Sequence, residues 1–343
     1  MSSTSMTGVA KAMVAKGKGI LAADESTGTI EKRLKGINVE NTEANRRAYR
    51  EMLFTTKGLP EHISGVILYD ETLRQKTADG KPFVELLAGN GILPGIKVDT
   101  GARDMALCPG EKVAEGLDNL AKRCAEYVTL GAKFAKWRAV ITIGAGIPSA
   151  ACITANAHAL ARYAAICQAS GLVPIVEPEV LMDGDHTIER CEEVTERSLR
   201  EVFAALAGQR VQLEEMVLKP SMVISGKECP KQAGVQEVAE RTLRVLRRTV
   251  PAAMPGIAFL SGGQSDEIAT GHLDAMNRIG GAPWSLSFSY GRALQQPSLK
   301  AWKGSAANVV AAQRALHHRA RMNGLATLGQ YRTELEKEFG KAA

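Results

Sequence analysis

The stretch Met216-Val-Leu-Lys-Pro-Ser-Met-Val223 is a short apolar run interrupted by a single lysine, Lys219. Seven similar runs recur along the chain, each bounded by Gly, Pro or polar residues. They are Gly19–Ser26, Gly65–Glu71, Pro94–Asp99, Ala132–Ile141, Leu172–Leu181, Gly256–Gly262 and Trp284–Tyr290. Longer segments with helical period separate them, among them Gly116–Gly131, Ala155–Gly171, Thr187–Leu206 and Gln236–Pro251. Strands that alternate with helices indicate a parallel sheet, and eight such units predict the α/β class and a closed (β/α)8 TIM barrel.

The chain has 343 residues, of which 45% are apolar and 23% charged, an ordinary globular composition. Barrels of this length form one domain, so we expect a single domain over residues 1–343. The N-terminal residues read as an amphipathic helix that leads into the first strand, and the end, Leu335–Ala343, as a short helical tail. A long first loop, residues 28–64, holds a basic helix at Asn45–Thr55.

The net charge of +6 raises the question of an acidic partner. The basic residues are dispersed and aromatic residues make up only 5%, so the sequence predicts no nucleic-acid binding. An anionic small substrate, such as a phosphorylated one, fits better. No apolar stretch is long enough to span a membrane, and no secretory signal is present. Six scattered cysteines indicate reduced thiols, which predicts a cytoplasmic protein.

Lys219 can be interpreted in two ways. It could be a strand-end lysine whose charge reaches water along its aliphatic stem. Alternatively, burial lowers its pKa and makes it a nucleophile that forms a Schiff base with a carbonyl substrate.

Charged residues late in the other strands favour the second interpretation. Cations and carboxylates both occur there, often with the period of two that places them on one face of a strand. They are Asp24, Lys97, Lys136, Arg138, Glu177 and Glu179. Any one pair could be a structural salt bridge. Together they predict a cluster at the C-terminal mouth of the barrel, where barrel active sites lie. The carboxylates would supply acid–base groups, and the cations would help to keep Lys219 neutral.

Two segments resemble anion-binding loops. Leu260–Asp266 follows the seventh strand and contains Ser261 and Gly262, and Ser289–Leu294 follows the eighth and contains Gly291 and Arg292. Loops at these two positions commonly bind phosphate in barrels.

A second anion site is predicted after the first strand. Its candidate residues are Ser26, Thr29, Lys32 and Arg33. The alternative is a helix N-cap followed by a solvated basic face. Two anion sites flanking a lysine would suit a bisphosphorylated carbonyl compound.

The histidines show no metal-ligand spacing. His62, His158, His186 and His272 are isolated, and His317 and His318 are adjacent in a basic helix. The sequence therefore predicts no metal site, and no nucleotide or other cofactor motif is present.

The ordered segments GKGILAADESTGTIEKRL, GVILYDETL, GIKVD, FAKWR, GLVPIVEPE, LKPSMV, FLSGGQS and FSYGRALQ cover almost the whole chain. On these segments the sequence closely resembles the class I fructose-bisphosphate aldolases. The resemblance implies reversible cleavage of fructose 1,6-bisphosphate to dihydroxyacetone phosphate and glyceraldehyde 3-phosphate through a lysine Schiff base, in glycolysis and gluconeogenesis. It also implies a homotetramer or a dimer. Another Schiff-base barrel enzyme, transaldolase-like, and a non-catalytic aldolase-like scaffold are the alternatives.

The resemblance also implies roles for individual residues. Lys219 matches the Schiff-base lysine, Glu177 the acid–base group, and Glu179 and Lys136 its polar partners. Asp24 matches the carboxylate that engages the C4 hydroxyl. Ser261, Gly262 and Arg292 match the 1-phosphate loop, Lys97 and Arg138 the basic lining, and Ser26 and Thr29 the other phosphate loop. Many relatives end in a tyrosine that reaches the site, whereas the last phenol here is Tyr331, which we expect in a helix.

Overall fold

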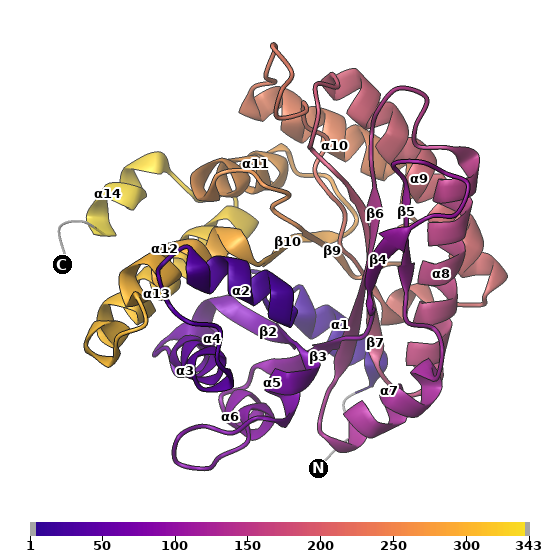
Figure 1. Ribbon diagram of the computed structural model, residues 1–343. Helices are drawn as coiled ribbons and strands as arrows, with labels where there is room; N and C mark the ends of the chain where they lie inside the picture. Colours follow the sequence, from indigo (N-terminus) through magenta and orange to yellow (C-terminus); the bar gives the residue numbers. More distant parts are fainter. Residues whose placement is uncertain (1–4, 340–343) are drawn as a thin grey trace.

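Eight parallel strands close into a barrel in the order β1-β10-β9-β8-β7-β6-β3-β2 (Figure 1). The computed structural model describes residues 5–339. The barrel strands are β1 (Gly19–Ala23), β2 (Ile63–Leu68), β3 (Leu93–Lys97), β6 (Phe134–Ile141), β7 (Val173–Val180), β8 (Val217–Leu218), β9 (Gly256–Phe259) and β10 (Ser285–Tyr290). Each lies within or beside one of the eight apolar runs, so the prediction of a (β/α)8 barrel is confirmed.

Helices surround the barrel (Figure 1). They are α2 (Thr27–Lys35), α3 (Glu43–Phe54), α4 (Leu59–His62), α5 (Asp70–Arg74), α6 (Phe83–Gly89), α7 (Leu120–Thr129), α8 (Ala150–Ala169), α9 (Ile188–Gly208), α10 (Val235–Thr249), α11 (Asp266–Ile279), α12 (Arg292–Trp302), α13 (Val309–Thr327) and α14 (Glu336–Phe339). Single turns of 3-10 helix lie at η1 (Leu213–Glu215), η2 (Ala306–Asn308) and η3 (Thr333–Leu335). Among residues 5–339, no helix has the length and apolar character needed to cross a membrane.

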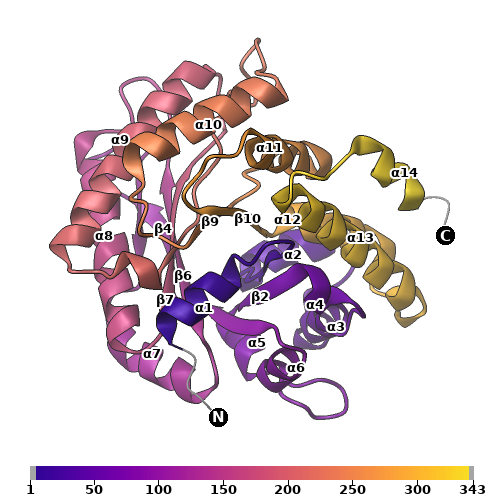
Figure 2. The same ribbon diagram turned by 180° about the vertical axis from the view of Figure 1, so that it is seen from behind.

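The first helix, α1 (Met6–Met13), packs against the barrel interior from its N-terminal end (Figure 2). Val9, Ala10 and Met13 are buried with inward-facing strand residues such as Ile20 and Phe134 in a core cluster of its own. A much larger apolar layer lies between strands and outer helices. Because α1 and this inner cluster fill the N-terminal end of the barrel, polar side chains gather at the opposite mouth.

Strand register places the charged positions side by side. Lys97 pairs with Lys136 across β3 and β6. Arg138 pairs with Glu177 across β6 and β7. The backbone N–H of Lys219, one residue beyond β8, donates to the Val176 carbonyl at 2.8 Å. The charged residues therefore occupy neighbouring strands at the carboxyl ends.

A two-stranded antiparallel hairpin, β4 (Gly101–Asp104) and β5 (Lys112–Glu115), follows β3 and was not predicted. Its residues are mostly half-exposed or exposed, so the sequence shows little hydrophobic alternation there. Ala114 in β5 is buried, and so is Glu111 in the connection before β5, whose carboxylate accepts from the Ser149 backbone N–H at 2.7 Å. This contact fastens the hairpin to the start of α8.

The chain end departs from expectation at one residue. Tyr331 lies in the non-helical connection between α13 and η3, not in a helix. Its hydroxyl donates to Glu336 at 3.0 Å, and its backbone N–H donates to Asp274 at 2.8 Å, so tertiary contacts decide its conformation. The predicted helical tail is present as α14, while residues 340–343 of it lie outside the described residues.

Candidate active site

Four charged side chains form a continuous chain of contacts inside the mouth of the barrel. Lys219 Nζ lies 3.2 Å from Oε1 of Glu177, and the other oxygen, Oε2, lies 3.0 Å from Lys136 Nζ. Lys136 in turn donates a hydrogen bond to Asp24 Oδ2 at 2.9 Å. The contact between Glu177 and Lys136 lacks hydrogen-bond geometry, so we describe it as an ion pair. All four residues are buried.

The environment separates the pKa values of the two lysines. Burial lowers the pKa of Lys219, and repulsion from Lys136 adds to this effect, although Glu177 and Asp24 oppose it. Burial would also lower the pKa of Lys136, but attraction to Asp24, Glu177 and Asp99 outweighs burial and raises it. Lys136 is therefore a permanent cation, and Lys219 is the lysine that can become a neutral amine.

Asp24 is held in its ionised form. Burial alone would raise its pKa, but the attraction of Lys136, Lys219 and Lys97 outweighs burial and lowers it well below the usual range. An ionised carboxylate at this position can accept a proton from a substrate hydroxyl.

Two further ion pairs lie at the rim. Arg138 contacts Glu179 through its Nε, and the Arg138 side chain is 41% exposed. Lys97 Nζ lies 3.7 Å from Asp99, whose other oxygen accepts from the Arg138 backbone N–H at 3.1 Å. Lys97 and Arg138 thus present positive charge toward the open end of the site.

The loops after β9 and β10 are joined by Arg292. Its guanidinium donates to the backbone carbonyl of Gln264 and, at 3.1 Å, to the side chain of Gln296. Gly262 and Gly263 both have positive φ, a conformation that favours glycine. Within residues 5–339, the backbone N–H groups of these two glycines donate to no protein acceptor. Free N–H groups beside a guanidinium can bind a phosphate.

The four residues predicted to bind an anion after the first strand do not all lie in one place. The hydroxyls of Ser26 and Thr29 face each other at 3.2 Å, and Lys32 is exposed on α2. Arg33 forms an ion pair with the buried carboxylate of Glu25, and its guanidinium lies beside Gly291. Arg33 therefore lies toward the β10 loop, whereas Ser26 and Thr29 lie at the start of α2 and Lys32 lies in its last turn.

The sequence did not predict the buried residues that hold the phosphate-binding groups in place. Glu25 is buried and also contacts Arg50 at 2.9 Å and Gln295 at 2.8 Å. A glutamate directly after Asp24 at the end of a buried strand was an available signal, because consecutive strand residues face opposite sides. His272, which contacts Gln264, gave no such signal, because an isolated histidine in a helix is uninformative.

The fold and this cluster define a (β/α)8 barrel enzyme equipped for amine–carbonyl chemistry, with a buried lysine beside ionised carboxylates and a second, permanently charged lysine.

Comparison with known proteins specifies the family. The family model described as "Fructose-bisphosphate aldolase class-I" matches residues 5–343. A protein of Xanthomonas campestris named "Probable fructose-bisphosphate aldolase class 1" is 61% identical over 97% of this chain and all of its own length. The cytoplasmic isozyme of Spinacia oleracea is 58% identical over 92% of this chain and 88% of its own. The solved structure of the Plasmodium falciparum aldolase is 52% identical over 95% of each chain, with a TM-score of 0.94.

This chain belongs to the class I fructose-bisphosphate aldolase family. Its reaction is the reversible aldol cleavage of fructose 1,6-bisphosphate to dihydroxyacetone phosphate and glyceraldehyde 3-phosphate, a step of glycolysis.

Proposed function

We propose that Lys219 is the amine that carries this reaction and that the neighbouring side chains move its protons. The observation that supports this assignment is the position of Lys219, buried and 3.2 Å from a glutamate that also contacts a second lysine. Among the lysines near the site, burial lowers the pKa of Lys219 while Lys136 has a raised pKa. A nucleophilic amine must be neutral, and Lys219 is the better candidate for that form.

The first half of the proposed reaction makes the Schiff base. The lone pair of Lys219 Nζ attacks C2 of the substrate and forms a carbinolamine. Glu177 first takes the proton that the Lys219 ammonium loses as it becomes the neutral amine. After the attack one proton moves from the nitrogen to the oxygen, and Glu177 then gives its own proton to the carbinolamine hydroxyl, which leaves as water and leaves a protonated iminium. Lys136 holds Glu177 from the opposite side of its carboxylate.

The second half breaks the C3–C4 bond. Asp24 accepts the proton of the C4 hydroxyl, the C4 aldehyde forms, and the bonding electrons move into the iminium to give an enamine. Glyceraldehyde 3-phosphate leaves, C3 of the enamine is protonated, and water releases dihydroxyacetone phosphate from Lys219. Every proton that Asp24 and Glu177 accept is returned in this cycle.

We assign the two phosphates to the two ends of the mouth. The 1-phosphate would contact Ser261, Gly262, Gly291 and Arg292, where free N–H groups and a guanidinium meet. The 6-phosphate would lie near Ser26, Thr29, Lys32 and Lys97. Arg33 would contact the substrate from its position beside Gly291. Glu179 would hold the Arg138 guanidinium in place through their ion pair.

Borohydride trapping tests the central assignment. The protein would be incubated with dihydroxyacetone phosphate and a chelator, reduced with borohydride, and mapped by peptide mass. We expect a reduced adduct on Lys219 and none in a Lys219→Met control. An adduct on Lys136 or Lys97, or no adduct at all, would overturn the assignment.

We further propose that the protein is cytoplasmic and forms a homotetramer or a dimer. The plant relatives named as cytoplasmic isozymes support the location. The resemblance to the family supports the oligomeric state. Light scattering after size-exclusion chromatography measures the state directly, and a monomer at micromolar concentration would contradict the proposal.

A further inference from the structure

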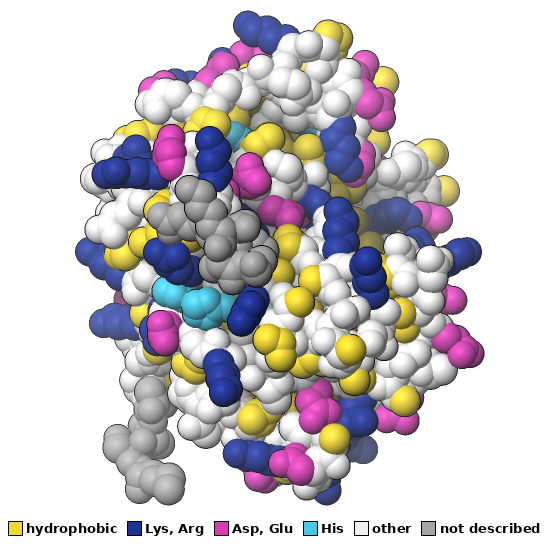
Figure 3. Space-filling model, turned by 90° about the vertical axis from the view of Figure 1, so that its left-hand side faces the viewer, with side chains coloured by type: hydrophobic (Ala, Val, Ile, Leu, Met, Phe, Trp, Pro, Cys, Tyr) yellow, Lys and Arg dark blue, Asp and Glu magenta, His cyan; other side chains and the backbone are white. Residues whose placement is uncertain are grey.

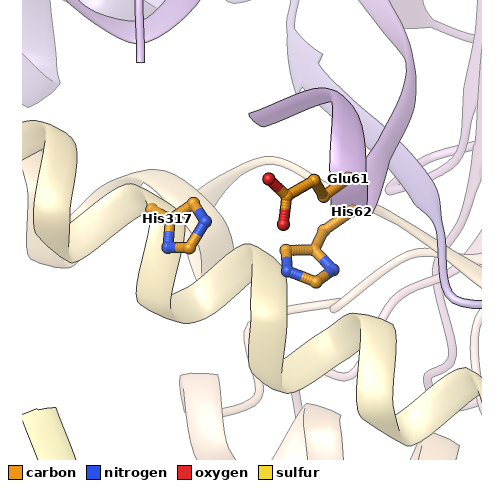
Figure 4. A group of neighbouring side chains, drawn as sticks. All are labelled: Glu61, His62 and His317. Atoms are coloured by element: carbon orange, nitrogen blue, oxygen red, sulfur yellow. The ribbon is translucent and has the colours of Figure 1, made fainter. Parts of the chain in front are cut away.

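Two histidines far apart in the sequence meet at the opposite end of the barrel from the active site. His62 is the last residue of α4, immediately before β2 begins, and His317 lies in the middle of α13. Their ring centroids are 5.6 Å apart and the rings are inclined by 60°. Figure 4 shows the carboxylate of Glu61 between the two rings. One ligand atom from each of the three residues lies within 4.8 Å of the others.

The three groups converge without bonding to one another. In the described part of the chain, no ion pair or side-chain hydrogen bond joins Glu61, His62 and His317. Both rings are half-buried and Glu61 is exposed. Figure 3 shows histidine side chains at the surface on one face of the molecule. The group is therefore open to an ion from solvent.

The surroundings of each ring fit a metal ligand. The Gly17 carbonyl oxygen and Nδ1 of His62 both border Gly324, where a Cβ would lie 2.6 Å from the oxygen and 3.0 Å from the nitrogen. A backbone carbonyl near one ring nitrogen suits a metal ligand, because metal-bound histidines commonly donate their second nitrogen to such a group. Gly58 makes room for the other ring, because a Cβ there would lie 2.7 Å from Nε2 of His317. A larger residue at 58 would displace that imidazole.

We propose that Glu61, His62 and His317 bind one Zn²⁺ ion. Two imidazoles and a carboxylate are a ligand set that zinc uses with a fourth position left for water. Tetrahedral zinc requires ligand atoms about 3.3 Å apart, so side-chain rotations that bring the ligand atoms closer by up to about 1.5 Å would complete the site. Glu61 supplies the negative charge, which offsets the nearby positive charge of Arg321.

The ion would act as a clamp and not as part of catalysis. It would join the segment before β2 to α13. Glu61 and His62 precede β2, so they lie at the N-terminal end of the barrel, whereas Lys219 lies at the carboxyl end. Zinc should therefore raise the thermal unfolding temperature without changing kcat. This inference does not depend on the Schiff-base assignment.

The test uses the full chain without an affinity tag, stripped with chelator and then titrated with Zn²⁺. Calorimetry should show one equivalent bound, and the unfolding temperature should rise with zinc. Co²⁺ should give the visible absorption of a tetrahedral site. Glu61→Gln, at an exposed position, should weaken binding at least about tenfold, and His317→Ala should abolish it. His158→Ala, an exposed histidine on α8, is the matched control and should bind as the wild type does.

Three results would overturn the proposal. The first is that zinc does not stabilise the wild type. The second is that Glu61→Gln and His317→Ala bind zinc with the affinity of the wild type. The third is that zinc binding is lost only when the cysteines are alkylated. The last result would place the ion on the thiols instead.

Discussion

Glu177 lies between two lysines whose pKa values are shifted in opposite directions. Its Oε1 is 3.2 Å from Lys219 Nζ, and its Oε2 is 3.0 Å from Lys136 Nζ. The pKa of Lys219 is lowered by burial, whereas that of Lys136 is raised by its carboxylate neighbours. One carboxylate can therefore exchange protons with Lys219 while Lys136 holds it in place. This relationship supports distinct predictions for each member of the group.

Glu177→Gln should lower kcat by about 100- to 10,000-fold, the usual contribution of a general acid–base group. The amide keeps the size of the side chain and cannot relay a proton to the carbinolamine hydroxyl. KM should change much less, because the phosphate loops are untouched. Steady-state kinetics and the yield of borohydride-trapped adduct measure both effects.

Glu179→Gln is the matched control, two residues along the same strand and paired with Arg138 at the rim. Its loss of kcat should be the smaller of the two, because Glu179 does not contact Lys219. Equal losses in both variants would contradict the assignment of Glu177 as the proton relay.

Lys136→Met should destabilise the protein by about 3–5 kcal/mol, because it leaves the buried carboxylates of Asp24 and Glu177 without their cation. Thermal unfolding at neutral pH measures the loss. Adding Asp24→Asn to this variant should recover part of the stability by removing one unpaired charge. If the stability lost in the double variant equals the sum of the losses in Lys136→Met and Asp24→Asn, the Asp24 carboxylate is not coupled to Lys136.

Asp24 should make stability depend on pH in the acid range. Its pKa is lowered in the folded chain, so on acidification the unfolded chain takes up the proton first. The contribution of Asp24 is complete above the unfolded-state pKa of about 4 and is lost as the pH falls toward the folded value. The difference in unfolding free energy between the wild type and Asp24→Asn should therefore shrink from pH 6 to pH 3. A difference that stays constant would show that Asp24 does not titrate in this way.

The barrel could be predicted because its strands are short apolar runs at regular intervals, and the charged positions could be predicted because they interrupt those runs. Lys219 in Met216–Val223 and Glu177 in Leu172–Leu181 are visible for this reason. The contacts behind the site could not be predicted in the same way. Arg50 belongs to a helix that reads only as basic, yet it is buried against Glu25.

Contacts between distant segments account for the other differences. The β4–β5 hairpin is fastened by Glu111 to the start of α8, and His62 meets His317 only because α13 packs against α4. Neither pairing leaves a local pattern in the sequence. The spacing of the histidines therefore predicted no metal site, although the fold brings two of them together.

His272 should act as a positioning residue for the 1-phosphate loop. Its Nδ1 donates to Gln264 Oε1 at 2.6 Å, and the Gln264 amide donates to the Ser261 carbonyl at 2.9 Å. Burial lowers the pKa of His272 to about 4, so the ring is neutral above that pH, and its bond to Gln264 requires the tautomer with the hydrogen on Nδ1. His272→Ala removes one buried hydrogen bond, worth about 1 kcal/mol, and should raise KM for fructose 1,6-bisphosphate about threefold to tenfold with little change in kcat. His272→Asn restores an N–H donor and should recover most of the affinity. If kcat falls instead, or if His272→Asn is no better than His272→Ala, the ring supports the fold generally and does not position the loop.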